Sequence, residues 1–394
     1  MRQNLIALVI ALFVTAVFFF IYMDLQPTVD YQQAPLFDGN QYLKIYQHFK
    51  NPDSNYQVSY PYHSRLLVPW LASLLPFEKP IPAFHAINLV FSLLSITALF
   101  LLWKALKINK LLLFVGFFWL IFHWTGMIRL NLFDPVTVDV ALYFFQTLLL
   151  VIIWYGRYEA LLLLGPLATA QKESFIALLI MLTAISLYRK LRYKMDAPEL
   201  KWIAGALLLS LITKLLINQL FPPLEVERNV FVVILFHLKE VALDPVRLLR
   251  WAVGIFVAFG GPLLLFFLNA PKNKWQDWFE LKLLLFSLLY LFFGIGAGGD
   301  ILRILFLGFP FIMTLILIRL NQVNGQLIII SMIVSIPLFK FRAVIPDPVR
   351  EWKVFVEWYP EYASLQMVLA WLVFGLLCLM VLFFSNRHYS KKNI

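Results

Sequence analysis

The sequence predicts an all-α, polytopic membrane protein with about twelve transmembrane helices, and two observations carry this prediction. Hydrophobic residues make up 61% of the 394 residues and charged residues only 14%, with a mean hydropathy of +0.80, whereas about a quarter of the residues of a soluble domain are charged. Apolar runs of about 20 residues, long enough to cross a hydrocarbon core as helices, follow one another from residue 4 to residue 385. Little of the chain is left for a soluble domain, so residues 1–394 are expected to form a single integral-membrane domain.

The first of these runs predicts an uncleaved membrane anchor, because it is longer than the core of a signal peptide and ends in bulky residues without a small-residue cleavage site. The next apolar spans follow a first outer loop, residues 24–81, which is rich in Tyr and Pro. Its segment "RLLVPWLASLLP" predicts a short helix along the membrane interface. The expected spans are 4–23, 82–103, 111–128, 137–154, 158–170, 173–188, 201–217, 249–268, 279–295, 302–319, 326–339 and 363–385.

Short basic segments predict that both termini are cytoplasmic. With this orientation "KALKINK", "YRKLRYK", "PKNK" and "NRHYSKK" all face the cytoplasm, as the positive-inside rule requires. Most acidic residues then lie in outer loops, so any chemistry is expected at the outer face, and the expected location is the bacterial inner (plasma) membrane. The net charge of +11 is explained by the basic loops and anionic membrane lipids, so no nucleic-acid partner is expected. Cys378 is the single cysteine, which excludes an intrachain disulfide.

Two residues of the first outer loop are candidates for function. Asp38, in "LFDGNQY", could remove a proton from an acceptor hydroxyl or help to hold a divalent ion. The alternative is an Asp-Gly turn with a purely structural role. Arg65 begins the apolar segment of the loop, where its forked donors could bind a lipid phosphate. It could equally extend to the lipid head groups without a specific ligand.

Four further charged residues lie where helices are expected to begin or end. Asp134 precedes a proline and is typical of a helix N-cap. Asp139 falls within the following apolar helix, where a carboxylate is costly and therefore more indicative of function. Lys172 and Glu173 lie at a turn between two apolar helices. They could form a neutralised corner, although adjacent residues do not face each other on a helix, or Lys172 could offer a point charge to a phosphate.

The segment "GIGAGGDILRILFLGFP" gives the sharpest local signal. Asp300 ends a glycine run and opens a helix that carries Arg303 on the same face, three residues later. A helix N-terminus attracts anions, and Arg303 would add a fixed cation there. The alternative is a capped helix with an internal Asp–Arg pair. The glycine run is not a phosphate-binding P-loop, because it lacks the Lys-Ser/Thr that completes that motif.

The order of these motifs resembles the C-type integral-membrane glycosyltransferases. The motifs are "FDGNQY" after the first helix, "YHSRLLVPWLA" before the second, "FDPVTVD" after the third, "QKES" near the sixth and "GGDILRILFLGFP" late in the chain. The resemblance implies transfer of a sugar from a polyprenyl-phosphate lipid to an acceptor at the outer face, with an acidic residue of the first loop central to catalysis. An inverting single displacement is the expected mechanism, and the sequence names neither the sugar nor the acceptor.

The resemblance also implies residue roles. Asp38 is expected to be the catalytic base, with Asp139 or Asp134 as a second acid. The residues expected at the lipid-phosphate site are Arg303, Lys172, Arg65, Asp300 and Glu173. Many family members carry two adjacent acids in the first loop, whereas Gly39 follows Asp38 here. A divalent cation (Mg²⁺ or Mn²⁺) is therefore an open expectation, and no metal ligand is assigned.

Two other classes of protein fit the same residues. A transporter or a flippase for lipid-linked saccharides would use the outer charges as a substrate pathway, although no internal repeat is visible and only "AFGGPLLL" interrupts a predicted helix with Gly and Pro. A non-catalytic scaffold would use the later outer loops, "PPLEVERNVFVVILFHLKEVALDP" and "FRAVIPDPVREWKVFVEWYPEY", as docking surfaces. Their aromatic and charged residues fit interfacial helices equally well.

Overall fold

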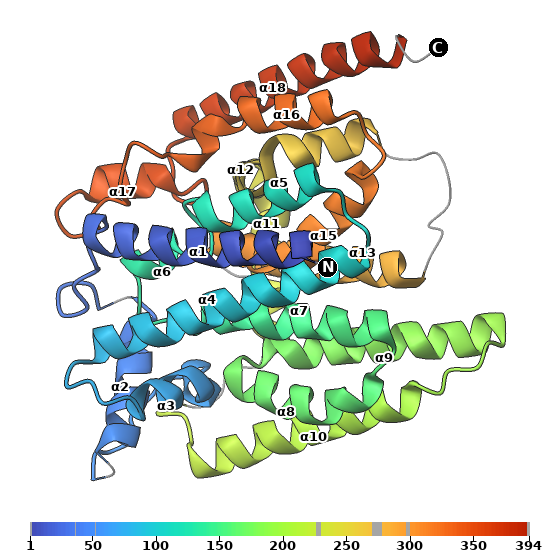
Figure 1. Ribbon diagram of the computed structural model, residues 1–394. Coiled ribbons are helices and arrows are strands. Elements are labelled where there is room, and N and C mark those ends of the chain that lie inside the picture. Colours follow the sequence, from blue (N-terminus) through green and yellow to red (C-terminus); the bar gives the residue numbers. More distant parts are fainter. Residues whose placement is uncertain are drawn as a thin grey trace. The chain divides into compact units, whose positions relative to one another are not determined.

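The chain folds into α-helices and short 3-10 helices in a computed structural model (Figure 1). The structure describes residues 2–35, 37–51, 53–225, 230–269, 278–296 and 300–391. Helices account for 76% of the residues, and none of the described residues forms a strand. The predicted all-α fold class is therefore confirmed. The basic segment "PKNK" and residues 297–299, Ala-Gly-Gly, lie outside the described residues.

The helices belong to two compact units. Unit 1 comprises Met1–Phe19, Thr28–Leu102 and Asn131–Arg228, and unit 2 comprises Phe20–Pro27, Trp103–Leu130 and Asn229–Ile394. Three helices contribute residues to both units: α1 (Arg2–Leu25), α4 (Pro80–Ala105) and α6 (Arg129–Phe133). The expectation of one integral-membrane domain stays a prediction.

Unit 1 is built around helices that follow one another closely in the sequence. Its remaining elements are α2 (Gly39–Lys50), η1 (Tyr62–Ser64), α3 (Leu67–Ser73), α7 (Asp139–Tyr155), η2 (Tyr158–Ala160), α8 (Leu161–Gln171), α9 (Ser174–Tyr193) and α10 (Leu200–Leu220). Helix α8 packs against α7, α9 and α10, and α2 packs against α3 (Figure 1). The predicted interfacial helix corresponds to α3, which buries Val68 and Ala72 and exposes Trp70.

Unit 2 contains the C-terminal helices. Its elements are α5 (Lys110–Phe122), α11 (Val230–Leu243), α12 (Pro245–Leu268), α13 (Trp278–Gly296), α14 (Ile301–Leu307), α15 (Phe309–Leu320), α16 (Gly325–Val334), η3 (Ile336–Phe339), α17 (Trp352–Trp358) and α18 (Leu365–Lys391). Helix α12 packs against α14, α16 and α18, and α13 packs against α14 and α15. The loops predicted to carry interfacial helices contain α11 and α17.

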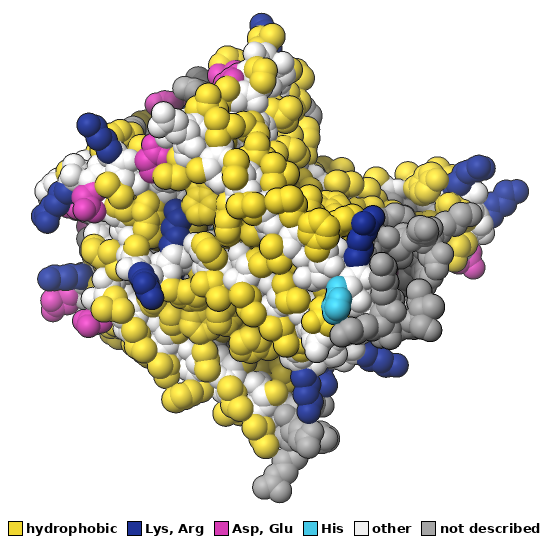
Figure 2. All heavy atoms as spheres, turned by 90° about the horizontal axis from the view of Figure 1, so that it is seen from above, with side chains coloured by type: hydrophobic (Ala, Val, Ile, Leu, Met, Phe, Trp, Pro, Cys, Tyr) yellow, Lys and Arg dark blue, Asp and Glu magenta, His cyan; other side chains and the backbone are white. Residues whose placement is uncertain are grey.

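Seven of the described helices are long and apolar enough to cross a membrane, or eight if one bent pair is counted as a span. The seven are Leu5–Leu25, Pro80–Ala105, Ser174–Tyr193, Leu200–Leu220, Pro245–Leu268, Trp278–Gly296 and Leu365–Tyr389. Their outer surfaces are apolar, as most of the face shown in Figure 2 is, and an integral-membrane helical protein is the class that this pattern indicates.

The expected count of twelve spans is not confirmed, because several predicted helices are shorter in the structure. The run expected over 111–128 ends at Phe122, where His123 takes an extended conformation. The runs expected over 158–170 and 326–339 form α-helices of 11 and 10 residues, each preceded or followed by a 3-10 turn. At about 1.5 Å per residue, helices of this length reach only halfway across a hydrocarbon core of about 30 Å.

Two helices of unit 2 are broken. Gly260, inside α12, has φ 46° and ψ −138°, a conformation that is essentially restricted to glycine. The run predicted as one helix over 302–319 is instead two helices, α14 and α15, bent by 61° at Gly308. The expectation that "AFGGPLLL" is the one interruption of a predicted helix is therefore corrected, because a second break follows at Gly308.

Candidate functional site

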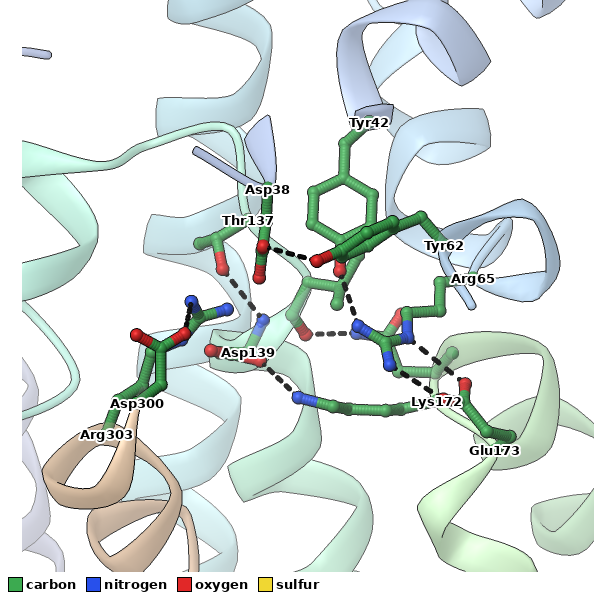
Figure 3. Close-up of polar contacts among 12 residues, drawn as sticks. Asp38, Tyr42, Tyr62, Arg65, Thr137, Asp139, Lys172, Glu173, Asp300 and Arg303 are labelled. Carbon is green, nitrogen blue, oxygen red and sulfur yellow. Dashed lines mark hydrogen bonds and ion pairs between the residues drawn. The ribbon is translucent and has the colours of Figure 1, made fainter. Parts of the chain in front are cut away.

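The clearest polar contact in unit 1 is a buried ion pair between Arg65 and Glu173. Arg65 donates from Nη2 to Oε1 of Glu173 at 2.7 Å and from Nε to Oε2 at 3.1 Å, so the pair is bidentate (Figure 3). Burial alone would raise the pKa of Glu173, but the charge and hydrogen bonds of Arg65 lower that pKa to about 2. Burial alone would lower the pKa of Arg65, but the charge and hydrogen bonds of Glu173 hold the pKa of Arg65 well above its usual value. Both side chains are therefore ionised and fixed at neutral pH.

A second ion pair lies one residue earlier in the chain. Lys172 Nζ donates to Asp139 Oδ1 at 2.8 Å, and both side chains are almost fully buried (Figure 3). Asp139 is the first residue of α7, where the helix dipole favours a negative charge. The predicted neutralised corner between Lys172 and Glu173 is therefore wrong. The turn between α8 and α9 sends the two side chains to different partners, as expected for neighbours that do not share a face.

Asp38 is joined to these pairs through two tyrosines. Tyr62 donates from its hydroxyl to Asp38 Oδ1 at 2.7 Å, and the guanidinium of Arg65 lies 5.2 Å from the centroid of the Tyr62 ring (Figure 3). Arg65 also donates from Nη1 to the hydroxyl of the fully buried Tyr42 at 2.9 Å, and the two tyrosine rings meet edge to face. We call Asp38, Tyr62, Arg65, Glu173, Asp139 and Lys172, together with Tyr42, the unit 1 cluster.

The sequence did not single out Tyr42 or Tyr62 as functional residues. Tyr42 lies one helical turn after Asp38, and Tyr62 lies three residues before Arg65. An aromatic hydroxyl beside each predicted charged residue was the available signal, but nothing in the sequence shows which hydroxyl faces which charge.

The structural alternatives for the two aspartates of the "FDG" and "FDP" motifs both need correction. Gly39 does not turn the chain with left-handed angles; it is the first residue of α2, and a Cβ there would collide with the ring of Tyr31. Asp134 does not cap α7, whose N-cap is Val138. It accepts a hydrogen bond from the hydroxyl of Tyr31 at 2.6 Å instead, and that hydroxyl in turn accepts one from the backbone N–H of Val136 at 3.0 Å.

These contacts fix the first outer loop to the segment between α6 and α7. The backbone N–H of Val29 donates to the carbonyl of Phe133 at 2.8 Å, two residues before Tyr31 reaches Asp134. Tyr31 then packs so closely on Gly39 that the start of α2, and with it Asp38, is set by the same ring. Asp134 therefore contributes to the position of Asp38, and its expected role as a second acid stays a prediction.

In unit 2, Arg303 and Asp300 form the predicted pair on one face of α14, with Nη1 of Arg303 3.2 Å from Oδ2 of Asp300 (Figure 3). Asp300 precedes the helix without making a capping hydrogen bond from its side chain. The backbone N–H of Leu302 donates instead to Glu361 Oε1 at 3.2 Å. The sequence did not identify Glu361 as a candidate, because it lies 59 residues after Leu302 in the chain. The expected meeting of Asp38, Arg65, Lys172 and Arg303 in one outer cavity stays a prediction, and Arg303 belongs to the other unit.

A divalent cation at the unit 1 cluster stays an open expectation. In the structure Asp38 accepts a hydrogen bond from a tyrosine hydroxyl and Asp139 accepts one from an ammonium group. Among the described residues, no group of three or more His, Cys, Asp or Glu side chains could hold a metal ion. No step below is routed through a metal.

No known protein-family model matches this chain, and neither a curated protein nor a solved structure is significantly similar to it.

Proposed function

We propose that this protein is a membrane glycosyltransferase that moves a sugar from a polyprenyl-phosphate lipid to an acceptor hydroxyl at the outer membrane face. The observation that carries the proposal is the assembly of Asp38, Arg65, Asp139, Lys172 and Glu173 into one cluster, although they are spread over 136 residues of sequence. A carboxylate base beside buried cations is what attack by a hydroxyl and departure of a phosphate require. The resemblance of the motifs supplies the substrate class.

The proposed reaction is a single displacement at the anomeric carbon. Asp38 takes the proton of the acceptor hydroxyl as its oxygen forms the new bond to the anomeric carbon. The bond between that carbon and the phosphate oxygen of the lipid breaks, and the phosphate leaves with the electron pair. Attack opposite to the leaving group inverts the anomeric configuration, and a cation beside the phosphate stabilises the developing charge.

Lys172 is the better of the two unit 1 cations for that phosphate contact. Both edges of Arg65 are engaged, one by the two oxygens of Glu173 and the other by Tyr42, so Arg65 is suited to position the cluster. An ammonium is a point charge without a fixed fork and can exchange one oxygen partner for another. In this proposal Lys172 moves from Asp139 to the lipid phosphate, and Asp139 becomes available as the second acid. The expected roles of Arg303 and Asp300 at a lipid phosphate stay predictions, because both residues belong to unit 2.

The test is transfer from a panel of radiolabelled polyprenyl-phosphate sugars by the purified protein in nanodiscs. Asp38→Asn keeps the shape and the hydrogen bond from Tyr62, and loss of the base should lower kcat by about 10² to 10⁴. A Lys172→Gln, Asp139→Asn double variant avoids an unpaired buried carboxylate and should lower transfer by about a hundredfold. The matched control is an Arg189→Gln, Glu199→Gln double variant, because Arg189 and Glu199 form another largely buried ion pair of unit 1 outside the cluster.

Near wild-type transfer by a folded Asp38→Asn protein would remove Asp38 from the reaction. A loss of transfer in the Arg189→Gln, Glu199→Gln variant as large as in the Lys172→Gln, Asp139→Asn variant would show that removal of any ion pair has this effect. A wild-type protein that transfers no sugar from any donor of the panel would contradict the proposed activity itself.

The broken helices of unit 2 favour a second candidate, a transporter or flippase. Transporters build substrate sites from discontinuous helices, and both α12 and the α14–α15 pair are interrupted. This candidate predicts that a lipid-linked saccharide changes leaflet in proteoliposomes without any new glycosidic bond. Leaflet exchange at the same rate in protein-free liposomes would contradict it.

A further inference from the structure

Unit 2 contains a lysine that is enclosed by tryptophan side chains. Lys340 follows η3, and its φ of 49° lies in the left-handed region that lysine rarely adopts. Its Nζ atom lies 4.7 Å from the ring centroid of Trp124, 4.2 Å from that of Trp358 and 5.6 Å from that of Trp371. Nζ also donates to the backbone carbonyl of Trp358 at 3.1 Å. The backbone conformation thus directs this ammonium group into an aromatic enclosure.

A second cation lies against the same turn. Arg129 is completely buried, and its guanidinium donates to the carbonyls of Phe339, Lys340 and Ala343. Its face covers the ring of Tyr22 at 4.8 Å. Burial together with the charge of Arg129 lowers the pKa of Lys340 to about 7. The turn at 339–343 therefore brings Arg129 and the Lys340 amine together, and the hydrogen bonds and ring contacts described for them are with backbone carbonyls and aromatic rings.

Glu361 is the carboxyl group that interacts with Lys340, and it supplies little negative charge at neutral pH. Burial, reinforced by the neighbouring Asp300 carboxylate, raises the pKa of Glu361 to about 8. Only 7% of the residue is exposed, and Oε1 accepts from the backbone N–H of Leu302. The charge of Asp300 is matched by its own partner, Arg303. At pH 7 most Glu361 side chains thus carry a proton and can donate a hydrogen bond.

Four buried polar atoms around Lys340 have no hydrogen-bond partner. They are the indole nitrogens of Trp124 and Trp371, Nε of Arg129 and Oε2 of Glu361. The indole and guanidinium nitrogens are donors only, and the protonated carboxyl of Glu361 can also donate. Leaving such buried donors unpaired is unfavourable, because each has lost its hydrogen bonds to water. Because all four can donate, the ligand that satisfies them must bring acceptors.

We infer that Lys340, Arg129, Trp124, Trp371 and Glu361 form a binding site for a phosphate group, which we call the Lys340 site. A phosphate brings several acceptor oxygens and negative charge to two cations whose partners are carbonyls and rings. A metal ion would be repelled by those cations, and a neutral sugar would stack on indole faces that the ammonium group already covers. The inference assigns no step of sugar transfer to this site and does not depend on that activity.

The residue-resolved test is protection of the Lys340 amine from acetylation, measured by mass spectrometry on the full-length protein in maltoside detergent. The two probes are inorganic phosphate and phosphatidic acid in mixed micelles, which carry the same group in free and lipid form. We expect a saturating probe to slow acetylation of Lys340 by about tenfold or more, the change that corresponds to about 1.4 kcal/mol. Lys107 is the matched internal control, because it is also a left-handed lysine (φ 57°) but is exposed and outside the site.

Variants make the test independent of the labelling chemistry. Lys340→Gln should weaken binding of the effective probe, measured by isothermal titration calorimetry, by about ten- to a hundredfold, as expected for loss of a charged hydrogen bond. Lys107→Gln should bind as the wild type does. Trp371→Phe keeps an aromatic ring but removes the N–H, and it provides a second variant if Lys340→Gln fails to fold.

Protection by both probes supports recognition of the phosphate group itself. Protection by phosphatidic acid alone identifies a membrane lipid as the source, and protection by inorganic phosphate alone identifies a soluble one. If neither probe protects Lys340 at millimolar concentration, or if Lys340→Gln and Trp371→Phe both bind as tightly as the wild type, the Lys340 site does not exist.

Discussion

Tyr62 is the residue through which the candidate base meets the candidate ion pairs. Its hydroxyl donates to Asp38 while its ring faces Arg65, so one side chain performs two separable tasks. A hydrogen bond to a carboxylate favours the charged form. Tyr62 is therefore a positioning residue, and it also favours the form of Asp38 that can accept a proton.

Replacement of Tyr62 by Phe separates these two tasks. The Tyr62→Phe variant keeps the ring beside Arg65 and loses the donor, so the ionised Asp38 carboxylate becomes less favourable. We expect the acidic limb of the pH profile of kcat for sugar transfer to move to higher pH, with a loss in kcat of about tenfold. Tyr42→Phe is the matched control, since the hydroxyl that it removes accepts a hydrogen bond from Arg65. An acidic limb that shifts equally in both variants, or in neither, would contradict the role of Tyr62.

The chemical types of the site residues were predictable, whereas their pairing was not. A lone Asp, Lys or Arg at the end of an apolar run is conspicuous because charge is costly there, and Asp38, Asp139, Lys172 and Arg65 were found in this way. Partners separated by 33 and 108 residues, as in Lys172–Asp139 and Arg65–Glu173, are determined by how the helices pack. Lys340 and Glu361 attracted no attention in the sequence, because what distinguishes them is burial beside other charges.

At the scale of helices, the sequence predicted where apolar segments begin more reliably than how they continue. The spans at 82–103, 201–217 and 279–295 correspond closely to α4, α10 and α13. The run at 302–319 contains the same apolar composition, yet it is bent by 61°. Hydropathy records which residues prefer lipid or core, and it contains no information about the backbone angle at a single glycine such as Gly308.

Gly260 provides a test at the same scale. A Cβ at this position would lie 2.7 Å from both the Trp119 and the Leu338 side chains, and the backbone angles are strained for any residue but glycine. We expect Gly260→Ala to lower the free energy of unfolding by about 2–4 kcal/mol and the melting temperature by several degrees. The measurement is thermal unfolding of the purified protein in detergent.

Gly325→Ala is the control for Gly260→Ala. Gly325 begins α16 in the same unit, and a Cβ there would make an ordinary contact at 3.4 Å with the Leu111 side chain. We expect it to melt within a degree or two of the wild type. Equal melting temperatures for the two variants would contradict this prediction, because they would show that the break in α12 accommodates a Cβ at position 260 without loss of stability.

At the scale of the whole molecule, the orientation in the membrane decides which side the unit 1 cluster faces. The basic segments "YRKLRYK" and "NRHYSKK" predict cytoplasmic termini. In a background with Cys378 replaced by Ala, a cysteine at Asn55 should react with an impermeant maleimide added to intact cells. A cysteine at Asn386 should react only after the membrane is opened. The reverse pattern would place Asp38 and its partners on the cytoplasmic side.

The long-range contacts of the first outer loop also set an order of events during synthesis. Tyr31 needs Asp134, 103 residues later, and Arg65 needs Glu173, 108 residues later. At a synthesis rate of about 5–20 residues per second, Arg65 exists for roughly 5–20 s before its carboxylate partner has been made. During that interval the candidate membrane span Leu5–Leu25 has already been made, while Arg65 is without its carboxylate partner. A ribosome that stalls before residue 173 would therefore release an anchored chain with an unpaired arginine, which quality-control proteases could distinguish from the finished protein.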